Sequence, residues 1–168
     1  MLNVGNVSAF AFNKSGEWLT WIISAEGQIG NGIQIRNMNS GIVLPLESDR
    51  ANYRSLNWTD EGDAFAALKG KEDKRYEDDL YSLLGFSNLS PSGADKAFYD
   101  PTEDSEFPAG MTISQNRTPQ WMDGLDGILF GIAEAQEADE AAESEDAESD
   151  SEQDEPGTPG RGNRRGED

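Results

Sequence analysis

An all-β fold is the prediction for this sequence, and it depends on hydrophobic alternation, turn chemistry and an internal repeat. The stretch FNKSGEWLTW, Phe12 to Trp21, contains an aromatic residue, a polar turn ending in glycine and an alternating hydrophobic run. Two ungapped copies follow, WTDEGDAFAA from Trp58 to Ala67 and WMDGLDGILF from Trp121 to Phe130. Half-buried strands have this period of two, and turns are rich in Gly, Asn and Asp. Each copy is therefore predicted to form a β-hairpin.

Equivalent positions of the three copies are mostly occupied by large apolar side chains. Taken position by position, they are Phe12, Trp58 and Trp121; Leu19, Phe65 and Ile128; and Trp21, Ala67 and Phe130. Aromatic residues at such positions either line a ligand funnel or fill a core. Because Trp58 and Trp121 precede a turn and are expected to face the same way as Phe12, packing between neighbouring sheets is the prediction.

Further strands enlarge the first two hairpins into longer units. Gly32–Met38 and Asn39–Leu46 are expected to supply a third strand, then a turn and a short fourth strand, and Asp79–Phe86 the third strand of the second unit. The first two copies start 46 residues apart, close to the roughly 40–45 residues of a four-stranded propeller blade. The next spacing, 63 residues, implies an insertion, which we place at Ser90–Pro108. The predicted architecture is a partial β-propeller of antiparallel blades, about two and a half repeats long, over residues 1–133.

The remaining residues, 134–168, differ sharply in composition. They carry 14 acidic and 3 basic side chains of a chain whose net charge is -20. Self-repulsion and the lack of large apolar residues leave nothing to offset the entropy of ordering such a segment. We therefore predict a disordered acidic tail or an inserted linker.

Composition also limits the function. The chain has no cysteine and no histidine, which removes thiolate chemistry, the commonest metal ligand and the usual general base. Its acidic balance disfavours nucleic acid as a partner. No apolar run approaches the roughly 20 residues that span a bilayer, so membrane insertion is not expected. The opening residues lack a signal-peptide pattern, and the compartment, cytoplasmic or periplasmic, stays open.

Four stretches suggest a ligand site at first sight. The glycines of Gly27–Gly32 suggest a phosphate loop, but a strand is expected after them, where such a loop requires a helix. Asp60–Asp63 and Asp123–Gly127 suggest calcium, yet the spacing of a calcium loop is missing and turn chemistry explains both. Lys69–Arg75 suggests an anion site, but its interleaved acids favour an exposed, self-neutralising loop. No cofactor or metal site is therefore predicted.

Several of these stretches resemble a known family. The repeats of TolB-like and dipeptidyl-peptidase-type β-propellers are similar to AFAFNKSGEWLTW, GIQIRNMNSGIVLPL, LNWTDEGDAFAAL and TPQWMDGLDGILFGI. The longer run FPAGMTISQNRTPQWMDGLDGILFGIAE resembles the N-terminal propeller of bacterial prolyl oligopeptidase family serine peptidases. The resemblance covers residues 7–133. These peptidases carry Ser, Asp and His on a C-terminal α/β-hydrolase domain, with the serine in a G-x-S-x-G turn. This sequence has neither that turn nor a histidine, so no catalytic residue is carried over.

The resemblance implies a non-catalytic propeller portion of a serine peptidase that gates or binds peptide substrate. Its partners would be peptide or protein, together with the missing blades and the hydrolase domain of the parent chain. The alternative is a stand-alone TolB-like or WD-repeat-like interaction module whose open sheet edges pair with a partner or another copy. An enzyme that uses carboxylates alone stays possible, although no spacing supports it.

Overall fold

The computed structural model describes residues 4–138 and shows an all-β chain. Its strands form two four-stranded sheets and two two-stranded sheets, all antiparallel. Within the described residues, the helical turns are two short 3-10 helices, η1 (Glu26–Gln28) and η2 (Pro101–Glu103). The all-β prediction is confirmed. Disorder was predicted for the acidic segment, which from residue 139 on lies outside the residues that the structure describes.

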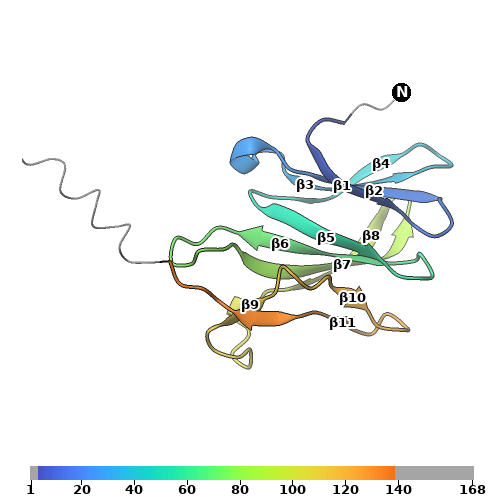
Figure 1. Cartoon of the computed structure of the whole chain (residues 1–168). Helices are drawn as coiled ribbons and strands as arrows, with labels where there is room; N and C mark the ends of the chain where they lie inside the picture. The colour runs from blue at the N-terminus through green and yellow to red at the C-terminus, as the bar shows by residue number, and fades with distance from the viewer. Residues whose placement is uncertain (1–3, 139–168) are drawn as a thin grey trace, which may run out of the picture. The chain divides into compact units, whose positions relative to one another are not determined.

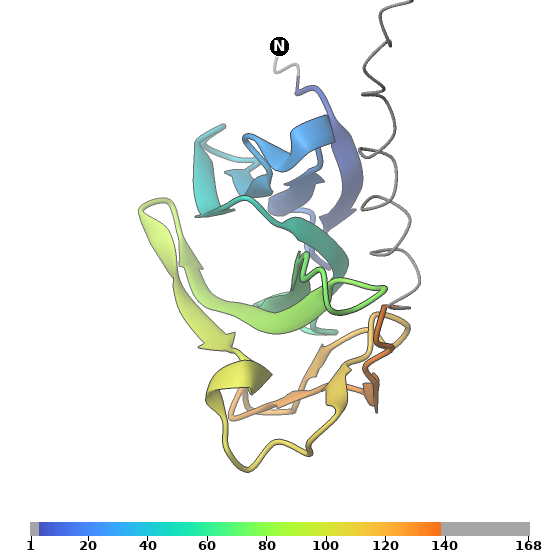
Figure 2. The same ribbon diagram turned by 90° about the vertical axis from the view of Figure 1, so that its left-hand side faces the viewer.

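The two large sheets are simple meanders, in which each strand pairs with the one before it. The first sheet consists of β1 (Val7–Phe12), β2 (Trp18–Ile23), β3 (Gly32–Asn37) and β4 (Val43–Ser48). The second consists of β5 (Asn52–Trp58), β6 (Phe65–Lys71), β7 (Leu80–Ser90) and β8 (Gly93–Tyr99). Figures 1 and 2 show the sheets stacked in chain order, with the strands after β8 forming a third layer.

The third layer is a long, irregular hairpin. It contains β9 (Met111–Ile113), β10 (Gln120–Trp121), β11 (Ile128–Leu129) and β12 (Ile132–Glu134). β10 pairs with β11, and β9 pairs with β12. After β12 the chain follows the β6–β7 loop, where the Glu77 amide donates to the Gln136 carbonyl at 2.9 Å and the Ala138 amide to the Arg75 carbonyl at 3.0 Å. The compact body thus continues to Ala138.

The three hairpins of the sequence repeat have the same register. In each, the first repeat position pairs across the hairpin with the position seven residues on. The pairs are Phe12 with Leu19, Trp58 with Phe65, and Trp121 with Ile128. Because side chains on opposite residues of antiparallel strands share one face of a sheet, these pairs mark the same face of all three layers.

The hairpin turns also share one hydrogen bond and one left-handed position. The amides of Gly16, Gly62 and Leu125 each donate to the carbonyl three residues earlier, at 3.0, 3.0 and 3.1 Å. All three residues are left-handed, with φ of 73°, 79° and 59°. Glycine adopts this region freely, whereas leucine does so at a cost in strain. The third turn differs in the residue before, because Gly124 is also left-handed, with φ of 84°, whereas the equivalent Ser15 and Glu61 are not.

A core fills the space between the first and second sheets. Ile22, Ile33 and Ile35 of the first sheet are fully or almost fully buried against Phe65 and Phe86 of the second. The ring of Phe65 lies 4.9 Å, centre to centre, from that of Phe86. Tightly packed aromatic rings contribute large apolar areas to such cores. Face-to-face burial of this kind holds the two sheets together.

A second, smaller core joins the second sheet to the third layer. Leu68 and Leu83 of the second sheet are buried with Ile113 of β9, and Ile128 and Phe130 pack against them. This face of the second sheet is the opposite of the one covered by the first sheet, because successive residues of a strand point to opposite sides. The second sheet is thus covered on both faces.

The fourth strand of the second sheet corrects one sequence prediction. The insertion expected at Ser90–Pro108 begins later, because Gly93–Tyr99 forms β8. Its turn is closed by the Ser90 hydroxyl, which donates to the Gly93 carbonyl at 3.1 Å. Ser-Pro-Ser-Gly is a recognisable turn sequence, and reading it as a loop concealed the strand that follows.

The first hairpin differs from its copies in burial. Phe12 is 51% exposed and Phe10 is 69% exposed. Trp58, the equivalent of Phe12, packs against the core and lies with its ring centre 4.9 Å from that of Phe65. Packing between sheets was expected for all three copies of this position, but among the described residues no sheet covers the Phe10 and Phe12 face.

Candidate functional site

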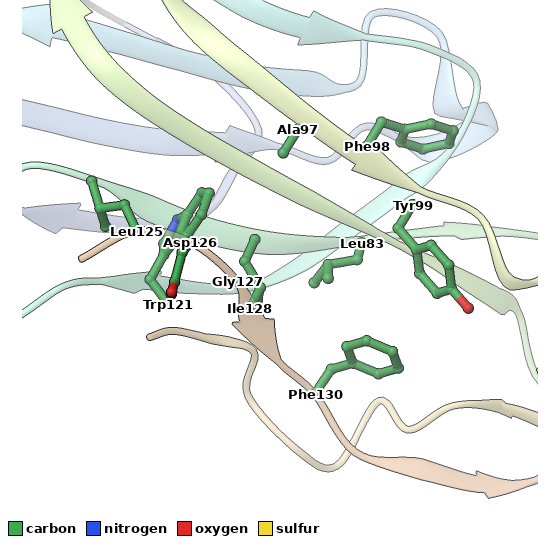
Figure 3. Close-up of a pocket in the computed structure, with 10 residues that line it drawn as sticks. All are labelled: Leu83, Ala97, Phe98, Tyr99, Trp121, Leu125, Asp126, Gly127, Ile128 and Phe130. Atoms are coloured by element: carbon green, nitrogen blue, oxygen red, sulfur yellow. The ribbon is translucent and has the colours of Figure 1, made fainter. Parts of the chain in front are cut away.

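An apolar groove between β8 and the third layer is the strongest candidate for a binding site. It has a volume of about 400 Å³. Its lining includes Leu83, Ala97, Phe98, Tyr99, Ile128 and Phe130, together with Trp121, Leu125 and Asp126. Figure 3 shows Ile128 and Leu83 near its middle, Phe130 and Tyr99 at one end, and Trp121 with Leu125 at the other.

One end of the groove is set by a close approach of backbone and ring. A Cβ atom on Gly85 would lie 2.6 Å from both the Trp121 ring and the Ile128 side chain. The Trp121 indole NH also donates to the Phe65 carbonyl at 3.0 Å. Glycine at position 85 therefore lets the third hairpin lie directly on the second sheet, and the indole bond fixes where it lies.

Tyr99 fixes the other end. Its ring centre lies 5.7 Å from that of Phe130. Its hydroxyl donates to the Asp104 carboxylate at 2.8 Å, so the polar tip is satisfied outside the groove while the ring lines it. Buried tyrosines commonly divide their two ends in this way.

The chemistry of the groove favours binding over catalysis. Asp126 is the single ionisable carboxylate among its lining residues, and Tyr99 is the single hydroxyl. A nucleophile requires a neighbouring base to become active, and the groove lining offers no such pair. Its residues suit apolar side chains of a ligand, as concave binding sites generally do.

A partly buried ion cluster, with Glu47 and Lys69 at its buried centre, lies between the first two sheets and is the second candidate. The Lys69 ammonium lies 2.7 Å from Glu47 and 2.8 Å from Asp49. Lys96 forms a further ion pair with Glu47, and the Tyr53 hydroxyl donates to the same carboxylate. Lysine and glutamate are rarely buried unless paired, and here each charge has a partner of opposite sign.

Mutual pairing explains the protonation of this cluster. Burial opposes ionisation of Glu47, but hydrogen bonds and charges from Lys69 and Lys96 outweigh it and lower the pKa of that carboxyl below its ordinary value. Burial likewise opposes the charge of Lys69, yet Asp49 and Glu47 raise its pKa. Burial and the Glu47 charge raise the pKa of Tyr53. These pKa shifts favour an ionised Glu47, an ionised Lys69 and a neutral Tyr53 at neutral pH.

The ion cluster therefore connects strands and offers no free reactive group. It joins β4, which carries Glu47, to β6 and β8, which carry Lys69 and Lys96. The Lys69–Arg75 stretch was expected to be an exposed loop. This is wrong for its first three residues, which belong to β6, and Lys69 and Gly70 are buried there. The alternation Phe65, Ala67, Lys69 places the lysine on the core-facing side of the strand, a signal that was present in the sequence.

The other sequence candidates lie in turns. Gly27–Gly32 leads from η1 into β3, which is a strand, so the helix that a phosphate loop requires does not follow. Asp60–Asp63 and Asp123–Gly127 occupy two of the hairpin turns, and the Thr59 hydroxyl donates to Asp63 at 2.7 Å. Within residues 4–138 no three acidic side chains are placed to hold a metal ion.

Comparison with known proteins assigns no relative. No family model matches the sequence, and no curated protein matches it significantly. In the part of the chain that the structure describes, no helix has the length and apolar character needed to cross a membrane.

Proposed function

We propose that this chain is the non-catalytic part of a β-propeller belonging to a prolyl oligopeptidase-like serine peptidase, where it gates or binds peptide substrate. The observation that carries the propeller part is the common geometry of the three hairpins, which share the register and the hydrogen bond of the turn and lie on successive layers. The peptidase part is supported by the sequence resemblance described above.

The packing of successive layers supports a repeating stack. Ile33 and Ile35 of β3 face the second sheet and are buried there. Leu83 and Gly85 hold the equivalent places in β7. They pair with Leu68 and Ala66 of β6. In the first sheet, Ile33 and Ile35 pair with the equivalent residues of β2, which are Ile22 and Thr20. These two residues face the third layer. A propeller is built by this kind of regular, radial repetition.

The open face of the first sheet supports a further neighbour. Phe10 and Phe12 are 69% and 51% exposed, whereas the equivalent face of the second sheet, with Trp58 and Phe65, is covered by the first sheet. Neighbouring exposed aromatic residues are typical of an interaction site. In a propeller the preceding blade would cover them.

Chemistry in this proposal is carried out elsewhere in the parent protein. The chain contains no histidine and no cysteine, and its groove and ion cluster provide no activated nucleophile. We expect the purified 168-residue chain to hydrolyse no peptide substrate. The assay would use proline-containing chromogenic peptides, with a preparation from cells carrying the empty vector as the control for host peptidases.

The coding sequence on both sides of this chain tests the proposal directly. We expect the reading frame to continue through further hairpins of the WTDEGDAFAA type into a strand, a G-x-S-x-G turn and a later histidine. A frame that stops after Asp168, with no hydrolase domain encoded beside it, would contradict the peptidase assignment while leaving the repeat geometry intact.

A stand-alone interaction module is the second candidate, and the same exposed aromatic pair supports it. Phe10 and Phe12 would then contact a protein partner or another copy of the chain. Light scattering after gel filtration distinguishes the two. A module is expected to form one defined, stable species, whereas a part of a larger propeller is expected to aggregate through its uncovered faces.

A further inference from the structure

Among residues 4–138, the third layer has no counterpart of the strand that follows the hairpin in the other two sheets. In the second sheet, β6 pairs with β5 on one side and β7 on the other, so Phe65 is opposite both Trp58 and Phe86. Ile128 is the equivalent of Phe65 in the third hairpin. Within residues 4–138, β10 and β11 form a two-stranded sheet, and Ile128 is opposite Trp121 alone.

One edge of β11, called the free edge below, has no described partner strand, and its backbone groups point away from β10. A hydrogen bond from the Thr59 amide to the Ala64 carbonyl, 2.9 Å, closes the second hairpin, and one from the Met122 amide to the Gly127 carbonyl, 2.8 Å, closes the third. Backbone groups alternate in direction along a strand of an antiparallel pair. In the second hairpin this alternation points the amide and carbonyl of Phe65 toward β7. Ile128 is also one residue after the closing hydrogen bond, so its amide and carbonyl point away from β10.

The groove lies where the side chains of that missing strand would pack. β7 of the second sheet places Leu84 and Phe86 in the core against Ile33 and Ile35 of the first sheet. The equivalent surface one layer on includes Leu83, Ala97 and Tyr99, and these residues line the groove. Ala97 is exposed there. The free edge and the groove are thus parts of one incomplete site.

We propose that this site accepts an extended polypeptide strand, antiparallel to β11, with bulky apolar side chains two residues apart that fill the groove. Main-chain pairing with the β11 edge would provide affinity, and the groove would select the alternate side chains, as in other cases of strand addition. Leu84 and Phe86 of β7 indicate the spacing and size that fit.

The strand comes from outside these 168 residues. From residue 133 to residue 168 the sequence contains no Val, Ile, Leu, Met, Phe, Tyr or Trp, so the acidic segment has no side chain that fills an apolar groove. The inference rests on the geometry of the repeat and does not require the peptidase assignment. Peptide binding tests the strand site, and the flanking coding sequence separately tests the peptidase assignment.

The probe is a peptide that copies β7, the third strand of the second sheet. It has the sequence DLYSLLGF, Asp79 to Phe86, with two lysines added at each end for solubility and a fluorescent label. Two N-methylated versions serve as a matched pair, one methylated at the residues that correspond to Leu84 and Phe86 and one at those that correspond to Leu83 and Gly85. In β7 the first pair lies opposite Ala67 and Phe65, whose backbone groups point toward it.

Fluorescence anisotropy with the full chain should show saturable binding of the unmodified peptide. We expect methylation at the Leu84 and Phe86 positions to weaken binding at least tenfold, and methylation at the other two positions to change it less than threefold. Ala97→Glu, which places a carboxylate in the groove, should also weaken binding at least tenfold. Circular dichroism of that variant should match the unchanged chain, because Ala97 is exposed.

Three results would overturn the inference. They are the absence of binding, equal binding of the two methylated peptides, and binding that Ala97→Glu leaves unchanged. Each of the last two would mean that the peptide adheres elsewhere. A dimer of the chain that dissociates in the Ala97→Glu variant would assign the site to a second copy and would contradict an outside strand.

Discussion

The hairpins of the first and second sheets have the same repeat pattern but different surroundings. Phe12 and Trp58 occupy equivalent positions, opposite Leu19 and Phe65. Trp58 packs between two sheets, whereas Phe12 is 51% exposed. The difference shows that the same repeat position is covered by a neighbouring sheet at Trp58 and, among the described residues, by none at Phe12.

The largest expected effect comes from truncating the two equivalent aromatic residues. Trp58→Ala should lower the free energy of unfolding by about 3–5 kcal/mol, because it empties a large aromatic site in a packed core. Phe12→Ala should change it by less than about 1 kcal/mol, because that ring is half exposed. Denaturant unfolding of both variants measures the difference. Equal losses would mean that the Phe12 face is covered in solution, and an unchanged midpoint for Trp58→Ala would refute the packing assignment.

The ion cluster is present between the first two sheets and provides the next test. Glu47→Gln should destabilise by about 3 kcal/mol, because it leaves buried Lys69 with Asp49 as its remaining carboxylate partner. Asp73→Asn, which removes the exposed pair with Arg75, is the matched control and should leave the free energy of unfolding almost unchanged. Similar losses for the two variants would contradict a structural role for the ion cluster.

The same cluster predicts a pH dependence. The folded state lowers the pKa of Glu47 from an ordinary value of 4.5. A carboxyl with a lowered pKa contributes stability above its unfolded pKa and loses it as the pH falls toward the folded one. The stability difference between the unchanged chain and Glu47→Gln should therefore be full at pH 7 and shrink below about pH 4.5. A difference that is constant from pH 7 to pH 3 would contradict the assigned pairing.

A smaller effect tests the contact of the third layer. Gly85→Ala should destabilise by about 1–3 kcal/mol, because the added methyl group would overlap the Trp121 ring and Ile128. Gly5→Ala is the control, since a Cβ there would meet no atom within 4 Å. Thermal unfolding of both variants measures the change. Equal behaviour of the two variants would mean that the third hairpin does not lie on Gly85.

Local patterns in the sequence predict the hairpins, because each consists of a turn and an alternating run within a few residues. The exposure of Phe12 could not be predicted in this way, since it depends on which neighbouring sheet is present. The ion cluster was missed because Glu47 and Lys96 are far apart in the sequence and meet only after the sheets stack. β8 was missed because its charged residues read as a loop, and Lys96 among them is balanced by Glu47. The groove depends on the relation of layers, which no local pattern contains.

The central claim is that the layers are equivalent repeats and that the third is incomplete. Amide hydrogen exchange at equivalent residues of β6 and β11 tests this claim most directly. Phe65 and Ala67 are covered by β7 on that edge, whereas Ile128 and Phe130 lie along the edge without a described partner strand. We expect the amides of Phe65 and Ala67 to exchange only with the opening of the whole body, and those of Ile128 and Phe130 to exchange at least a hundredfold faster. Equally slow exchange at both pairs would contradict the account, because it would show that the third hairpin already has its strand.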